Sequence, residues 1–336
     1  MNQTDAAFRS LISGGPWAIR SEALERCLAG VFAGADPAAD LLADADPGEV
    51  EAMYAARGTG SRSGTVAVVP IIGPITKRDS IFTMLFGGTS TTRLTQQLRA
   101  LAADESVATI LLNIDSPGGT VSGVPELAAE VRRTAESRRV VAIANDMAAS
   151  AAYWIASQAD EVIATPEALV GSVGVFAMHQ DVSGLMEQMG VRTTFIQAGR
   201  YKTEGNPYEP LSDEARAHVQ SIVDAAHAQF VNDVAKGRGR DGATVTPAQV
   251  RADYGEGRVL TAKDAKAVGM IDRIETYSQA VSRLAGVKPT GLRAAVASDV
   301  PEAMLPEDAV GSVEQAEAAR RGMRLELDGY AWRLGS

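Results

Sequence analysis

Residues 140–160 read VVAIANDMAASAAYWIASQAD, and this stretch decides the fold. Its first five residues are apolar and partly β-branched, which predicts a buried strand. From Ala151 onward the residues are apolar on nearly every side of a helix, which is typical of a buried helix. The pattern therefore predicts a strand that passes through a tight turn into a helix, with Ser150 where the helix begins.

Two interpretations of Ser150 fit this pattern. A serine at the start of a helix is commonly a small core residue or an N-cap. A tight strand-to-helix turn can also hold a serine nucleophile beside free backbone N–H groups. The stretch alone favours the first interpretation, so the choice depends on the rest of the chain.

Strand-like and helix-like segments alternate through the sequence that follows Gly64. Short apolar runs predict strands at TVAVVPIIG (65–73), VATILLNI (107–114), EVIAT (161–165), GSVGVFA (171–177) and VRTTFIQ (191–197). Apolar residues at helical spacing predict helices at 93–103, 124–136 and 212–236, with a short helix that begins at Thr261. This alternation predicts an α/β domain whose strands pair in parallel.

The composition argues against several classes of protein. A formal charge of −10 argues against nucleic acid as the main partner, since phosphate binding needs a basic surface. Neither an apolar run of about 18 residues nor a signal-peptide pattern occurs, so we expect a soluble, cytoplasmic chain without a membrane anchor. The single cysteine and three histidines argue against a disulfide and a zinc site. We expect no metal and no other cofactor.

Two glycine-containing turns are candidates for a site. DSPGG (115–119) closes a buried strand, and its glycines can turn backbone N–H groups outward without obstruction by a Cβ. Such N–H groups can hold the oxyanion of an acyl-transfer transition state, although SPGG alone is most often a plain turn. GSVGV (171–175) has glycines where a backbone or ligand can approach closely, and Ser172 there could orient a neighbouring side chain.

Lys202 lies in the polar segment GRYKTEGNPYEPLS (199–212), before the clearest predicted helix. A lysine in such a segment is ordinarily a surface residue. A lysine that acts as a general base must be neutral, which requires burial or a nearby positive charge. A lysine of this kind takes the proton of the nucleophile in serine–lysine catalysis.

The ordered set SPGG, MAAS, GSVGV and the downstream lysine resembles the signal-peptide-peptidase-A family of serine–lysine peptidases. The resemblance extends over about residues 65–274. It implies a ClpP/crotonase-like fold of repeated ββα units, in a single catalytic domain that assembles into a ring or dome. It also implies a serine endopeptidase that cleaves peptide bonds through an acyl-enzyme.

The same resemblance assigns roles to individual residues. Ser150 is the implied nucleophile, and Lys202 is the implied general base. Ser172 is placed to orient the lysine amine. Gly119, together with Gly118, offers the N–H groups of an oxyanion hole.

Within the family, the chain resembles the soluble phage head-maturation, or capsid assembly, proteases. ANDMAAS, a histidine soon after GSVGV, and KTEGNPY followed by a proline and a long helix carry this resemblance. It implies protein substrates such as phage scaffold and portal proteins, cleaved in the host cytoplasm inside the procapsid. A bacterial peptidase that degrades signal peptides is the alternative within the family.

Three further alternatives stay open on the sequence alone. His179 follows GSVGV and is the runner-up base for Ser150. Crotonase-type enzymes share the fold and hold a thioester enolate with two backbone N–H groups, but they do not need this serine or lysine. A catalytically inactive capsid-assembly scaffold protein is the non-enzymatic alternative.

Composition also predicts the organisation of the domains. Residues 1–61 have weak helical patterning and end in a breaker-rich segment, which indicates a helical N-terminal appendage and linker. Residues 62–285 form the predicted peptidase domain. Residues 286–336 read as a linker and C-terminal tail.

Overall fold

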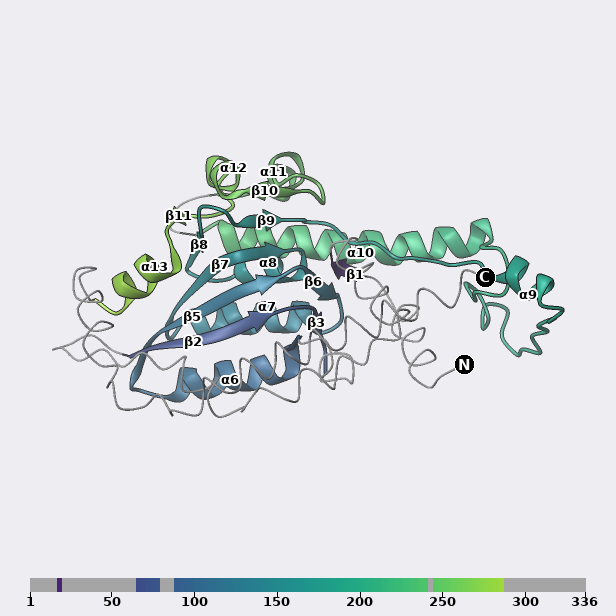
Figure 1. The fold of residues 1–336 in the computed structure, drawn as a ribbon, viewed down its shortest axis with the longest axis horizontal. Coiled ribbons are helices and arrows are strands. Elements are labelled where there is room, and N and C mark those ends of the chain that lie inside the picture. Colours follow the sequence, from purple (N-terminus) through teal and green to yellow (C-terminus); the bar gives the residue numbers. More distant parts are fainter. Residues whose placement is uncertain (1–16, 20–64, 79–87, 241–243, 287–336) are drawn as a thin grey trace, which may run out of the picture. The chain divides into compact units, whose positions relative to one another are not determined.

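The computed structural model describes residues 17–19, 65–78, 88–240 and 244–286, which Figure 1 shows in colour. Most of the predicted N-terminal appendage and nearly all of the predicted C-terminal tail lie outside these residues. The predicted domain boundaries after residues 61 and 285 therefore stay predictions.

A seven-stranded sheet forms the centre of the fold, and its central strand is β7. The sheet consists of β2 (Thr65–Ile72), β5 (Val107–Ser116), β7 (Arg139–Ala149), β8 (Glu161–Ala164), β9 (Leu169–Gly171), β10 (Val259–Thr261) and β11 (Arg273–Ile274). Strand β7 pairs in parallel with β5 along most of its length. On its other edge its first half pairs with β8 and its last three residues with β9, both in parallel. The predicted α/β fold with parallel strand pairs is confirmed.

A second, smaller sheet lies beside the ends of β5 and β7. Its order is β1 (Trp17–Ile19), β6 (Gly118–Thr120), β3 (Ile75–Thr76) and β4 (Thr89–Ser90). Strand β6 contains the two glycines of DSPGG, and it pairs in parallel with β3 but antiparallel with β1. The small sheet therefore begins where the carboxyl end of β5 leaves the large sheet.

Four helices follow the sequence predictions closely. They are α6 (Thr91–Ala103), α7 (Val124–Ala135), α8 (Ala151–Ala156) and α10 (Asp213–Arg238). Helix α6 begins at a serine N-cap, and α10 begins at Ser212, with two acidic residues in its first turn and two basic residues in its last turn. The shorter helices are α9 (Ser183–Gln188), α11 (Pro247–Asp253), α12 (Ala262–Ala267) and α13 (Tyr277–Leu284).

Helix α8 is buried on every side, as its composition predicts. All six of its residues are buried. Three of the six, Ala151, Ala152 and Ala156, are alanines, so α7 and the sheet can approach the helix closely. Trp154 is the large anchor: its ring stacks on Phe230 of α10 at 4.4 Å between centroids, and its indole N–H donates to Asp233 at 3.1 Å. Helix α8 is therefore fixed to the C-terminal half of α10 (Figure 1).

Two predicted strands differ from the structure. The segment VRTTFIQ (191–197) is not a strand: none of the described strands pairs with it, and its side chains are largely exposed, with Ile196 99% exposed. In GSVGVFA only Gly171 belongs to a strand, and the chain beyond it is joined to Trp17 through one isolated bridge at Phe176. An apolar, β-branched pattern alone therefore does not produce a strand without a neighbour to bond.

The contact between α10 and α8 gives a test of this packing. A Cβ added at Gly237 would lie 2.1 Å from the backbone oxygen of Ser157. We expect Gly237→Ala to lower the free energy of unfolding by about 1–3 kcal/mol, because overpacking outweighs the usual helix preference for alanine. Urea denaturation measures the change.

Gly184 in α9 is the matched control, since an added Cβ there meets no atom within 4 Å. We expect Gly184→Ala to be neutral or slightly stabilising. Equal effects of the two substitutions would contradict the close packing of α8 against α10.

Candidate active site

Ser150 occupies the single residue between strand β7 and helix α8. Its backbone N–H donates to the Gly171 oxygen of β9 at 2.7 Å, and its own carbonyl accepts from the Trp154 N–H at 2.9 Å. It therefore makes a bond toward the neighbouring strand on one side and the first helical bond on the other. These two requirements hold Ser150 at φ 55° and ψ −119°, a conformation that residues with a Cβ rarely adopt.

The geometry of Ser150 favours the nucleophile interpretation over the N-cap interpretation. Its side chain makes no capping hydrogen bond to α8, and its Oγ lies 3.5 Å from the Gly174 oxygen, a long contact. The residue is only 1% exposed. Strained positions of this kind cost about 1–3 kcal/mol and concentrate at functional sites. A sharp strand-to-helix turn is also the setting of known serine nucleophiles.

The DSPGG turn lies directly against Ser150. A Cβ added at Gly118, whose φ is +100°, would lie 2.9 Å from the Ser150 Cβ and 3.0 Å from the Ala149 oxygen. A Cβ added at Gly119 would lie 1.8 Å from the Ile75 oxygen. Both positions therefore require glycine. At Gly118 the nearest obstruction is the Ala18 backbone oxygen, 2.2 Å from the added Cβ, followed by Ser150.

The two predicted oxyanion donors are neighbours in strand β6. The Gly118 N–H donates to the Ser116 Oγ at 3.2 Å, and that hydroxyl donates in turn to the Gly73 oxygen at 2.6 Å. Gly118 thus already has an acceptor within the turn. Gly119 is paired with Ala18 of β1 and with Ile75 of β3. The assignments of Gly118 and Gly119 as oxyanion donors stay predictions.

The GSVGV segment also lies at Ser150, as the sequence predicts. The Gly171 oxygen accepts the Ser150 N–H, and the Gly174 oxygen lies 3.5 Å from the Ser150 Oγ. Ser172 has a φ of 54° and is held by a 2.7 Å bond from its N–H to the Arg258 oxygen. It is 8% exposed, and within the described residues its hydroxyl has no hydrogen-bond partner. The hydroxyl is therefore available to orient another side chain.

Lys202 is not brought to Ser150 within one chain. It lies in an exposed turn, and its neighbours Arg200 and Tyr201 bind Glu214 in the first turn of α10. Ser150 lies instead at α8, which packs on Phe230. At about 1.5 Å per residue, α10 rises about 24 Å between Glu214 and Phe230.

The environment of Lys202 in one chain is that of an exposed residue, not of a buried base. Within the described residues its ammonium group has no ion pair and no hydrogen bond. Figure 1 shows this segment with α9 at one end of the long helix α10. One chain therefore holds the predicted nucleophile and the predicted base at separate places.

His179 lies with the Lys202 segment rather than with Ser150. Its Nε2 is 3.0 Å from the Asn206 oxygen. A carbonyl can only accept, so this nitrogen carries the proton. The runner-up pair of Ser150 and His179 is accordingly not in contact in one chain.

Two features near the site were not anticipated from the sequence. Strand β1 pairs with β6 and brings Ala18 against Gly118; the short apolar run PWAI in a glycine-rich, polar neighbourhood was the available signal. The second feature is a pair of carboxylates, Asp115 near the end of β5 and Asp146 in β7. The pKa of the Asp115 carboxyl is raised, first by partial burial and then by the negative charge of Asp146.

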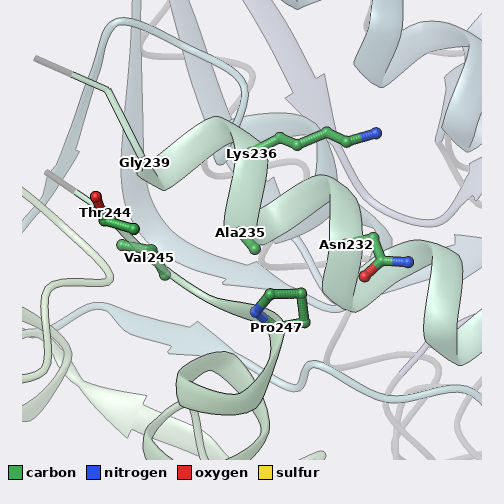
Figure 2. Close-up of a pocket in the computed structure, with 7 residues that line it drawn as sticks. All are labelled: Asn232, Ala235, Lys236, Gly239, Thr244, Val245 and Pro247. Carbon is green, nitrogen blue, oxygen red and sulfur yellow. The ribbon is translucent and has the colours of Figure 1, made fainter. Parts of the chain in front are cut away.

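Two hollows lie away from Ser150. A cavity of about 360 Å³ lies between the end of α10 and the segment before α11, and Figure 2 shows its lining. None of its lining residues is a predicted site residue. A larger groove of about 690 Å³ runs between the segment after GSVGV and the first half of α10, and His179 is part of its wall.

Two family models match the chain. Residues 132–289 match peptidase family S49, and residues 69–191 match the Clp protease family. The ClpP-like fold and the resemblance to signal-peptide-peptidase-A proteins, predicted from the sequence, are confirmed.

Several known proteins are similar to the same region. A putative protease of Methanocaldococcus jannaschii is 32% identical over 188 residues, which are 55% of this chain and 57% of that protein. Capsid assembly protease C of Escherichia phage lambda is 32% identical over 217 residues, 65% of this chain and 48% of that protein. A putative signal peptide peptidase SppA of Enterococcus faecium is 31% identical over 189 residues, 56% of this chain and 53% of that protein.

The chain spans about half the length of these relatives. In the parts of the chain that the structure describes, no helix has the length and apolar character needed to cross a membrane.

The strained backbone at Ser150 leads to a stability test. Glycine ordinarily destabilises a protein relative to alanine by about 0.5–1 kcal/mol. At a φ of 55° we expect the reverse, with Ser150→Gly more stable than Ser150→Ala by about 1–2 kcal/mol in thermal unfolding.

The control is the preceding residue, Ala149, which is buried at the end of β7 and has no positive φ. Ala149→Gly should destabilise the protein in the ordinary direction. A Ser150→Gly variant that is less stable than Ser150→Ala would refute the strain.

Proposed function

We propose that this chain, whose residues 132–289 match peptidase family S49, is a serine endopeptidase with Ser150 as nucleophile and Lys202 as general base. The observation that supports the proposal most strongly is Ser150 itself. It is buried, its backbone is strained, its hydroxyl does not cap the helix, and two glycine turns surround it. If Ser150 had only a structural role, a glycine at this position would relieve the strain and stabilise the fold.

The proposed reaction proceeds through an acyl-enzyme. The neutral amine of Lys202 accepts the hydroxyl proton of Ser150 while the Oγ attacks the carbonyl carbon of the substrate. The negative charge on the carbonyl oxygen is held by the Gly119 N–H, with Gly118 as a second donor, at about 3–4 kcal/mol per donor. The C–N bond breaks, and the lysine returns the proton to the leaving amine. Water, activated by the same amine, then hydrolyses the ester.

The position of Lys202 leads to a second part of the proposal, namely that the base is supplied by a neighbouring copy of the chain. The two groups are separated along α10 in one chain, as described above. Most of the large apolar side chains that are exposed in the structure also lie in the region around Lys202. They are Leu185, Met189, Val191, Ile196, Tyr201, Tyr208 and Ile222.

Such a surface is typical of a contact between proteins. A second copy that covers it would remove Lys202 from water, which favours the neutral amine that a general base requires. The hydroxyl of Ser172, which lies in the segment that contacts Ser150, is then the proposed partner of the incoming amine. In a closed ring or dome, every chain would supply its Lys202 to one neighbour and receive Lys202 from another.

The proposed substrates are phage head proteins, such as scaffold and portal. The similarity to the capsid assembly protease of phage lambda supports this choice. Degradation of signal peptides is the second candidate, supported by the similarity to the peptidase of Enterococcus faecium. A co-encoded head protein and a synthetic signal peptide, offered to the same preparation, separate the two by which one is cut.

A mixing experiment tests the nucleophile, the base and the shared site together. We expect Ser150→Ala and Lys202→Ala each to lower kcat/KM on unfolded casein by at least about a thousandfold. When equal amounts of the two variants are dissociated and reassembled, about one site in four of a closed ring regains both groups. We therefore expect the mixture to recover about a quarter of the wild-type activity.

Other outcomes of this experiment have definite meanings. No recovery, from assemblies of unchanged size, would place both residues of a site in one chain. His179→Ala serves as the matched control and should retain activity. If His179→Ala is inactive while Lys202→Ala is active, histidine is the base. If the wild type cleaves no protein, the inactive scaffold alternative takes precedence.

A further inference from the structure

Strand β1, residues 17–19, lies between two segments of the candidate site. On one edge it pairs antiparallel with β6, and Ala18 is opposite Gly119. On the other edge Trp17 and Phe176 exchange two backbone hydrogen bonds, of 2.8 and 3.0 Å. Three residues of the N-terminal segment are thus inserted as a strand between the DSPGG turn and the chain that follows GSVGV.

The middle residue of this strand lies next to the nucleophile. The position that a Cβ on Gly118 would occupy is 2.2 Å from the Ala18 oxygen and 2.9 Å from the Ser150 Cβ. The space between the Ala18 carbonyl and Ser150 is therefore too small to hold a methyl group, and the two groups are neighbours. A peptide carbonyl beside the nucleophile and the Gly118–Gly119 backbone is where a substrate carbonyl must lie for attack.

The side chains of the strand are accommodated in two different ways. Ala18 is fully buried and belongs to the main core. Trp17 and Ile19 are 4% and 5% exposed, and they form a separate small cluster with Phe176 and Met178. The site thus encloses a small residue at the nucleophile and a large apolar residue on either side of it.

The pairing of β1 also differs from that of the sheet to which it is added. Among the described strands of the small sheet, β3 pairs in parallel with both β4 and β6, whereas β1 is antiparallel to β6. In the sequence, β1 is followed by 45 residues before β2 begins. Antiparallel addition of a short strand to a sheet edge is a common way to bind an extended peptide.

We infer that the position between β6 and Phe176, beside Ser150, takes an extended peptide with a small residue between two large apolar residues, and that Trp17–Ile19 of this chain is its resident ligand. The inference rests on the proposed peptidase function and specifies its substrate. It has a regulatory consequence: a substrate must displace the N-terminal strand, so the strand inhibits the peptidase.

The first test weakens the resident strand. In Trp17→Ser/Ile19→Ser the apolar side chains that hold the strand are removed, and we expect kcat/KM on casein to rise about tenfold. Leu11→Ser/Ile12→Ser removes two apolar side chains from the same N-terminal segment, outside β1, and should leave the rate unchanged. Equal rates in both variants would overturn the inference.

A binding measurement makes the test independent of catalysis. All proteins for it carry Ser150→Ala, and the ligand is a fluorescent peptide with the sequence of residues 14–22, GGPWAIRSE. We expect the peptide to bind the Trp17→Ser/Ile19→Ser protein, and to bind the protein with an intact strand about tenfold more weakly. A peptide with serine in place of tryptophan and isoleucine should not bind.

The combined results distinguish this inference from the proposed function. Binding of the peptide by a protein that cleaves nothing would overturn the peptidase proposal and keep the resident strand. Proteolysis without peptide binding would do the opposite. If Trp17→Ser/Ile19→Ser unfolds in circular dichroism and the peptide does not restore the fold, β1 is a structural strand and the inference is wrong.

Discussion

The two backbone hydrogen bonds of Ser150 are the constraint on which the rest of the site depends. Its N–H completes the contact between β7 and β9, and its carbonyl begins helix α8. A residue that serves a strand and a helix at once, without an intervening loop, has to turn sharply, and the positive φ follows. The strain holds the hydroxyl at the end of the central strand, where the DSPGG and GSVGV segments converge. Strain of about 1–3 kcal/mol is tolerable because the buried residues of α8 and β7 hold both sides of the turn.

The same packing explains why the site is divided. Helix α8 can be buried because its residues beside the sheet are small, and Trp154 fixes it to the C-terminal half of α10. Helix α10 has 26 residues, more than the contact with α8 requires, and its other end is bound to the Lys202 segment. A rigid helix of this length keeps the proposed nucleophile and base apart. Under the proposed function, activity would therefore depend on assembly, since only another copy could supply the missing amine.

The sequence predicted the local structure around Ser150 well, because each signal there is short-range. The apolar run of β7, the alanines of α8 and the glycines at 118 and 119 each specify their own conformation, and the structure has them where they were expected. The strand predicted at VRTTFIQ did not form, because none of the strands in the described residues pairs with this segment. The separation of Lys202 from Ser150 was equally inaccessible, since it depends on which end of α10 packs against α8. Strand β1 was not predicted, because a run of three apolar residues is too short to show a strand period.

The proposed base and the resident strand together describe a peptidase whose nucleophile is preformed. Two conditions for activity are not met in one chain: Lys202 must come from another copy, and β1 must be displaced. The conformation of Ser150 depends on β7, β9 and α8, and none of these contacts involves Lys202 or β1. Association of two chains and displacement of three residues would therefore complete the site without rearrangement of β7, β9 or α8. Each step is favoured in an assembly where neighbouring chains and substrate are concentrated. A nucleophile held ready by strain, with its base and its substrate position controlled separately, would restrict proteolysis to the assembled state.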